Sequence, residues 1–164
     1  TRNKVVFGKG NNNSQILIIG EAPGKEEDIT AEPFVGRAGK LLTEILLSIK
    51  LTRDDVYITN TVKCRPPENR NPSNEEIKSC AGYLDQQIEL ISPKVIILLG
   101  KVAAERILNS SEPMVSLRKK IHFYKNTKIP TLVFYHPAYL LRSPNEKRKV
   151  WEDLLFMKEN INVS

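Results

Sequence analysis

The stretch Ile16-Leu17-Ile18-Ile19-Gly20-Glu21-Ala22-Pro23-Gly24 decides the fold of this chain. Its first four residues are an apolar run typical of a buried strand, and a turn follows from Gly20 to Gly24. In open α/β sheets, ligands bind at the edge where such strands end. Gly20 and Gly24 let the main chain approach a ligand closely, and Pro23 stiffens the loop. An ordinary turn between a strand and a helix has the same composition, so the turn alone leaves both interpretations open.

The composition is that of a globular protein with a modest positive charge. The 164 residues are 40% hydrophobic and 27% charged, and their net charge is +6. This length suits one hydrophobic core, so we expect a single domain over residues 1–164. No window approaches the ~18 apolar residues of a membrane span, and the first residues are no signal peptide. The two cysteines are too few for a disulfide framework, which favours a reducing, cytoplasmic location.

Strand-like and helix-like segments alternate along the rest of the chain. Apolar runs predict further strands at 56–59, 95–99 and 131–135, with another candidate at 121–124. Helical patterns cover 41–50, 73–91, 102–108 and 145–159, and Ser73 begins the second of these with a capping box. We interpret Ser110–Lys120 as an irregular basic loop and the acidic run Glu26-Glu27-Asp28 as a solvated face. The alternation predicts an α/β fold, a three-layer αβα sandwich around a mainly parallel sheet.

Side chains of complementary chemistry follow the ends of these strands. Glu21 and Phe34 lie in the loop after the first strand, Asn60 ends the second, and His136 follows the last. The carboxyl ends of parallel strands share one edge of a sheet, so we expect these four side chains to line one cleft. Such a set suits a planar heterocycle. The alternatives are a core role for Phe34 and a turn or cap role for Asn60.

Four motifs, taken together, resemble those of the family-4 uracil-DNA glycosylases, the iron–sulfur-containing bacterial and archaeal members of their superfamily. The motifs are Gly20-Glu21-Ala22-Pro23-Gly24, Pro33-Phe34-Val35-Gly36-Arg37-Ala38-Gly39, Asn60-Thr61-Val62-Lys63-Cys64-Arg65-Pro66-Pro67 and His136-Pro137-Ala138-Tyr139-Leu140-Leu141-Arg142. The resemblance implies a four-stranded parallel sheet in the order 2-1-3-4. It also implies a monomer that hydrolyses the N-glycosidic bond of uracil in single- or double-stranded DNA and leaves an abasic site, the first step of base-excision repair.

The resemblance also implies roles for individual residues. His136 would donate to O2 of the leaving uracil, Asn60 would read the edge of the base, and Phe34 would stack against the flipped base. Further uracil-binding positions are Ala22, Gly24 and Glu27.

The catalytic base is the open point of this resemblance. The best-known branch of the superfamily has an Asp where this chain has Ala22. Glu21 would then either orient the attacking water or fix the loop, and Glu27 or Asp28 would line the pocket near C5 of the base.

A hydrophobic segment near the C-terminus resembles the family's DNA wedge. Leu140 and Leu141 would fill the gap left by the flipped base, and Arg142 would contact phosphate. The alternative is a hydrophobic start to the last helix. Lysines and arginines gathered in the last third of the chain would add sequence-independent attraction to DNA.

Cys64 and Cys80 match half of the family's four-cysteine site for a structural [4Fe–4S] cluster. Such a cluster takes four thiolates, and the family pattern places the other two upstream of Thr1. Either those residues precede this sequence in the protein, or this member of the family has lost the cluster, and we favour the first. The alternative is a pair of unrelated buried thiols.

Two other functions compete with this interpretation. One is a non-catalytic nucleotide- or nucleic-acid-binding α/β domain, and the other is a hydrolase that acts on free nucleotides. Only a glycosylase makes an abasic site, so release of uracil from an oligonucleotide separates the three.

Overall fold

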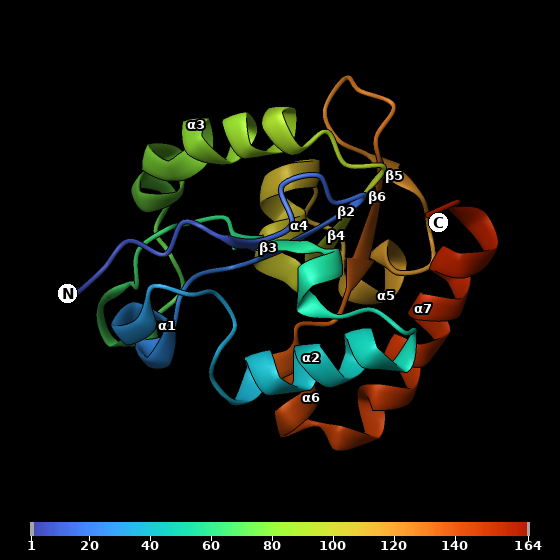
Figure 1. Ribbon diagram of the computed structural model, residues 1–164, viewed down its shortest axis with the longest axis horizontal. Helices are drawn as coiled ribbons and strands as arrows, with labels where there is room; N and C mark the ends of the chain where they lie inside the picture. Colours follow the sequence, from blue (N-terminus) through green and yellow to red (C-terminus); the bar gives the residue numbers. More distant parts are fainter. Residues whose placement is uncertain (1, 164) are drawn as a thin grey trace.

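The computed structural model describes residues 2–163, and Thr1 and Ser164 lie outside the described residues. At its centre is a six-stranded sheet in the order β1-β3-β2-β4-β6-β5 (Figure 1). The strands are β1 (Lys9–Gly10), β2 (Ile16–Gly20), β3 (Tyr57–Asn60), β4 (Val95–Leu99), β5 (His122–Phe123) and β6 (Pro130–Phe134). The α-helices are α1 (Lys25–Thr30), α2 (Arg37–Ser48), α3 (Asn74–Ile91), α4 (Lys101–Leu108), α5 (Met114–Leu117), α6 (Pro137–Arg142) and α7 (Lys147–Asn160). Short 3-10 helices cover Arg53–Asp55, Pro67–Asn69 and Pro144–Glu146.

The four central strands, β3, β2, β4 and β6, run parallel to their neighbours. The two edge strands, β1 and β5, pair antiparallel and have two residues each. The expected sheet of four strands is therefore corrected to a mixed sheet of six. The strand candidate at 121–124 contains β5, whereas β1 was not predicted because two residues are too few to produce an alternating or apolar pattern.

Alternate residues of β2 point to opposite faces of the sheet. Ile16 and Ile18 pack in a core cluster with side chains from α2, α6 and α7, whereas Leu17 and Ile19 pack with side chains from α3, α4 and α5. Figure 1 shows α3 and α4 on one side of the sheet and α2, α6 and α7 on the other. The layers are those expected for a buried parallel sheet. Within residues 2–163, no helix combines the length and apolar character that crossing a membrane requires.

The segment from 110 to 120 is not the irregular basic loop that its composition suggests. It contains α5, and the next residue, Arg118, is only 9% exposed. The Arg118 guanidinium pairs with the buried carboxylate of Asp153 at 2.9 Å and donates to the carbonyl of Lys149 at 3.0 Å. Charge in this segment therefore holds α7 against the sheet, where a buried cation needs a carboxylate partner.

The acidic run after the first turn is not a solvated face either. It lies in α1, and Asp28 is fully buried. The Asp28 carboxylate accepts hydrogen bonds from the backbone N–H groups of Asn3 and Lys4 and from the Asn3 side chain. Burial alone would raise the pKa of Asp28, but these hydrogen bonds outweigh burial and lower it. Asp28 thus anchors the N-terminal segment.

A buried lysine ties three parts of the chain together directly behind Asn60. Lys63 is 2% exposed, and its Nζ donates to Thr59 Oγ1 at 2.5 Å, to the Asn60 carbonyl at 2.8 Å and to Gln87 Oε1 at 2.5 Å. Three acceptors match the three protons of an ammonium group. The Phe7 ring lies 5.6 Å from the same Nζ. The contacts join the N-terminal segment, the end of β3 and α3, while burial lowers the pKa of Lys63 to about 7.

We expect Lys63→Met to lower the free energy of unfolding by about 1–3 kcal/mol, because the buried acceptors around Nζ lose their partner. The loss should depend on pH. The pKa of Lys63 is about 7 in the folded state and 10.5 in the unfolded state, so between these pH values the unfolded state binds more protons. The free energy of unfolding of the wild type should therefore rise with pH relative to that of Lys63→Met. Urea unfolding of both proteins at pH 7 and pH 9 measures this. A wild-type advantage that shrinks at pH 9 would contradict the assignment.

Candidate functional site

The centre of the site is the end of β2, where Gly20 pairs with Asn60 of β3. A Cβ atom on Gly20 would lie 2.5 Å from Cζ of Phe34 and 2.6 Å from Oδ1 of Asn60. No side chain fits in that space, so glycine is required for the ring and the amide to meet above the strand end. The structure thus brings together two of the residues that the sequence predicted at this edge.

The Asn60 amide is buried without a partner for its oxygen. Asn60 is 1% exposed, and within residues 2–163 no donor reaches its Oδ1. A buried acceptor left unpaired costs about 1–3 kcal/mol, so such a group in a native site indicates a ligand that completes it. The backbone of Asn60 is satisfied separately, because its carbonyl accepts from Lys63.

His136 is the residue before α6, and its ring caps that helix. Nδ1 accepts a hydrogen bond from the backbone N–H of Ala138 at 3.0 Å, which places the ring proton on Nε2. Burial, with a smaller contribution from the positive charge of Arg142, lowers the pKa of His136 to about 4. The imidazole is therefore neutral at physiological pH and keeps one N–H to donate. Its ring centroid lies 5.5 Å from that of Phe34.

Phe34 is 6% exposed and has the left-handed backbone conformation, with φ of 55°. This conformation costs a residue with a side chain about 1–2 kcal/mol, so the surrounding contacts must maintain it. Gly39 permits one of these contacts, because a Cβ there would lie 1.8 Å from the Phe34 carbonyl oxygen. The ring belongs to the core cluster that includes Ile16 and Ile18, as the alternative interpretation expected, but the backbone that carries it is a constrained loop.

The Glu27 carboxylate joins the two loops that follow β2. Its Oε1 accepts from the backbone N–H of Gly24 at 3.0 Å, and its Oε2 accepts from Val35 at 2.7 Å and Gly36 at 2.8 Å. Three donors already occupy this carboxylate, so its observed role is to hold the loops. Gly24 takes part through its N–H and precedes the first residue of α1.

A cleft of about 640 Å³ opens beside these residues. Its walls come from the loops after β2, β3, β4 and β6 and include Glu21, Ala22, Asn69, Asn71, Gly100, Lys101, Tyr135, His136, Tyr139 and Arg142. Phe34 and Asn60 are not among its lining residues and lie deeper, behind Gly20 and His136. Glu21 lines this cleft, and partial burial raises the pKa of its carboxyl group. We expected all four side chains to line one cleft. The cleft is lined by Glu21 and His136 but not by Phe34 and Asn60.

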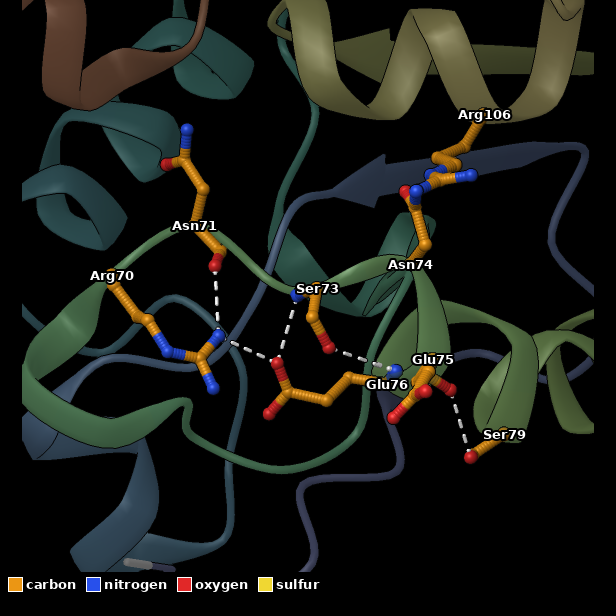
Figure 2. A network of polar contacts seen from close by, with 8 residues as sticks. All are labelled: Arg70, Asn71, Ser73, Asn74, Glu75, Glu76, Ser79 and Arg106. Atoms are coloured by element: carbon orange, nitrogen blue, oxygen red, sulfur yellow. Dashed lines mark hydrogen bonds and ion pairs between the residues drawn. The ribbon is translucent and has the colours of Figure 1, made fainter.

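The Pro-rich loop supplies two cleft residues that the sequence analysis missed, Asn69 and Asn71. Figure 2 shows how the loop is pinned to α3: Arg70 pairs with Glu76 at 2.6 Å, and Glu76 also accepts from the N–H of Ser73 at 2.8 Å. The Arg70 hydrogen bond is the main reason that the pKa of Glu76 falls to about 2. In Figure 2 the Asn71 side chain points away from this pair. The sequence did contain a signal for both residues, because polar residues in a loop that follows a strand can line the ligand site at that edge of the sheet.

The segment expected to form the DNA wedge is the short helix α6. Leu140 is fully buried in the core, so the prediction that it enters DNA is wrong. A helix places neighbouring residues on different faces, which buries Leu140 while Leu141 stays partly accessible and Arg142 exposed. Ser143 and Pro144 end this helix and begin a 3-10 turn before α7.

The two cysteine thiols lie around one arginine near the start of the chain. Arg2 donates to Sγ of Cys64 at 3.0 Å, and the backbone N–H of Lys63 donates to Sγ of Cys80 at 3.4 Å. The bond to Cys64 and the charges of both thiols raise the pKa of Arg2. Within the described part of the chain, no three His, Cys, Asp or Glu side chains gather as a metal-binding group. The thiols are therefore two ligands of the right type and not a full set.

Comparisons with known proteins agree on one family. The model of the uracil DNA glycosylase superfamily matches residues 7–155. The type-4 uracil-DNA glycosylase of Archaeoglobus fulgidus is 46% identical over 159 residues, which cover 93% of this chain and 80% of that protein. The type-4 uracil-DNA glycosylase of Thermotoga maritima is 47% identical over 155 residues, covering 91% of this chain and 78% of the relative.

A relative of another type is more distant. The type-5 uracil-DNA glycosylase of Pyrobaculum aerophilum is 30% identical over 146 residues, covering 80% of this chain and 64% of the relative. The resemblance read from the four motifs is thus confirmed. The superfamily model covers the chain from β1 into α7, and the two type-4 proteins are identical to this chain at over two fifths of the aligned residues. This chain therefore belongs to the uracil DNA glycosylase superfamily and, within it, to the type-4 uracil-DNA glycosylases.

Proposed function

We propose that this protein hydrolyses the N-glycosidic bond of uracil in DNA and leaves an abasic site for base-excision repair. The observation that carries the proposal is the buried, unpaired amide oxygen of Asn60 beside the Phe34 ring, at a strand end where only glycine fits. The imide N–H of uracil would donate a hydrogen bond to the unpaired Oδ1 of Asn60, and the Asn60 NH₂ would donate to a uracil carbonyl. Thymine presents the same hydrogen-bonding groups on this edge, so a site that is specific for uracil must exclude the methyl group of thymine sterically.

His136 supports the departure of the base. Breaking the glycosidic bond leaves negative charge on uracil, and a preorganised N–H donor stabilises that charge in a water-poor site. The Nδ1 bond from Ala138 keeps the proton on Nε2, the atom that would donate to O2. The ring is neutral, so it stabilises the anion as a hydrogen-bond donor.

Glu21 is the residue in the cleft that is best suited to orient the attacking water. Its carboxylate forms part of the same wall as His136, and no hydrogen bond within residues 2–163 engages its side-chain oxygens. The Glu27 carboxylate, by contrast, already accepts hydrogen bonds from three backbone N–H groups. The position where the best-known branch carries Asp is Ala22, which lines the cleft but has no group to polarise water.

DNA would enter along the cleft with its target nucleotide turned out of the helix. Arg142 and Lys101 line the cleft and would contact phosphates. Leu141, which precedes Arg142 in α6 and is partly accessible, would fill the space of the flipped base. Ala22 lines the same cleft, and Gly24 shapes the loop next to it.

We also propose that Cys64 and Cys80 hold two corners of a structural [4Fe–4S] cluster. Thiolates are the ligands that such clusters take. Both sulfur atoms already accept a hydrogen bond, and such bonds would stabilise negative charge on sulfur. The sequence contains two cysteines, so the other two ligands would come from outside it. When bound, the cluster would supply a rigid link between the Pro-rich loop and α3.

The wild-type protein should release uracil from a uracil-containing oligonucleotide and make it cleavable by alkali at the abasic site. Asn60→Ala should lower kcat/KM by roughly 10- to 10³-fold, the range for losing hydrogen bonds to a reacting group. Asn160→Ala, at the end of α7, is the matched control and should behave as the wild type. An inactive wild type would refute the glycosylase function and leave the two alternatives, a non-catalytic binding domain or a hydrolase of free nucleotides. Wild-type kcat/KM in Asn60→Ala would show that Asn60 does not bind the base.

The pH profile of kcat/KM should show an acid limb that belongs to Glu21. The group works when deprotonated, and burial raises its pKa above the ordinary 4.5, so activity should fall as pH drops toward that raised value. His136 stays neutral down to about pH 4 and should not contribute above it. Glu21→Gln should lower the rate and abolish the limb. A limb that survives in Glu21→Gln would assign it to another group.

The native protein isolated without oxygen should contain iron and acid-labile sulfide in equal amounts and absorb visible light. Cys64→Ser and Cys80→Ser should each lose iron, whereas Ser79→Ala, next to Cys80 on α3, should retain it. Iron and sulfide assays and the visible spectrum check this independently of activity. A colourless, iron-free and active native protein would rule out the cluster and leave the glycosylase function unaffected.

A further inference from the structure

Arg53 is a charged side chain outside all four motifs, yet it reaches the loop of Phe34. It lies in the 3-10 turn before β3, where Asp55 fixes the backbone by accepting from the N–H of Thr52 at 2.7 Å. Its Nη2 donates to the Pro33 carbonyl at 2.6 Å, and its Nη1 donates to the Phe34 carbonyl at 2.8 Å. Two parallel donors on two successive carbonyls are a geometry that a guanidinium offers and an ammonium does not.

The positive charge of Arg53 is directed at the backbone of this loop. Nη1 also donates to Thr43 Oγ1 at 3.3 Å, and none of the ion pairs within residues 2–163 includes Arg53. Burial lowers the pKa of Arg53, and the charges of Glu32 and Glu27 oppose this. A guanidinium remains protonated even so. Because this half-buried cation donates its hydrogen bonds to carbonyl groups, it fixes the direction in which those carbonyls point.

Phe34 therefore sits between two opposite charges. On one side Arg53 binds the carbonyls of Pro33 and Phe34, and on the other the Glu27 carboxylate binds the N–H groups of the next two residues. Between these contacts the chain takes the left-handed conformation at Phe34, which directs the ring over Gly20 toward Asn60. Neither contact is local in sequence, so both act only in the folded protein.

We propose that Arg53 is a positioning residue for base excision, which orients the Phe34 ring for stacking on the flipped uracil. The proposal rests on the proposed function and adds a residue to it. Arg53 does not touch the base. Its effect passes through the backbone at Phe34, so it should appear only in steps that use the stack and vanish when the ring is absent.

The test is a double-mutant cycle between Arg53→Lys and Phe34→Ala, with kcat/KM measured on a uracil-containing oligonucleotide. Arg53→Lys keeps the charge but replaces two parallel donors on separate nitrogens with a single nitrogen. It should lower kcat/KM by about 5- to 100-fold, up to the loss expected for a base–aromatic stack. In the Phe34→Ala background the same change should have no further effect. Binding to uracil-free duplex should be unchanged, because no base is stacked there.

Arg106→Lys, an equivalent change on α4, is the control and should keep wild-type kcat/KM. Equal losses from Arg53→Lys in both backgrounds, or wild-type activity in Arg53→Lys, would overturn the positioning role. Arg53→Met, which keeps the stem without donors, serves as the second variant. If neither Arg53 variant folds, the residue is structural and the proposal fails. An inactive wild type would instead refute the glycosylase function itself, so the two failures are distinguishable.

Discussion

The site depends on one steric constraint, the absence of a side chain at Gly20. This residue ends β2, and the space above it is shared by the Phe34 ring and the Asn60 amide. Any Cβ would push the ring or the amide aside, because the loop of Phe34 and the end of β3 both meet the end of β2 here. Because β2 is also a central strand with parallel neighbours on both sides, the position of Gly20 is fixed by the core.

The groups that surround this point are held by charges in a second layer. Glu27 binds three N–H groups of the two loops after β2, Arg53 binds carbonyls of the same region, and Lys63 binds the Asn60 carbonyl. Each of these charges is satisfied by backbone or side-chain dipoles and not by an opposite full charge. Within residues 2–163, Asn60 Oδ1 and the Nε2 proton of His136 have no hydrogen-bond partner, and these are the groups to which we assign contacts with the base. This division of labour matches the preorganisation that catalysis requires.

Features that depend on local sequence could be predicted, and features that depend on distant partners could not. The strand ending at Gly20 and the helix capped by Ser73 were predicted because an apolar run and a capping box are local patterns, and the structure confirms both. The motifs likewise identified the family. Arg118 was assigned to a loop because its partner, Asp153, lies far along the chain. Leu140 was assigned to DNA because a short motif does not reveal which side of a helix the core will cover.

The two-residue edge strands have a consequence for the behaviour of the protein at high concentration. A parallel sheet with open sides would offer rows of unpaired N–H and C=O groups as templates for another chain, which leads to aggregation. Here each side ends in a strand of two residues, and at one of them the exposed Lys9 pairs with Glu32 at 2.5 Å. A template of that length supports too few hydrogen bonds to recruit a second molecule. Edges this short limit the number of backbone hydrogen bonds through which two such parallel sheets could associate edge to edge.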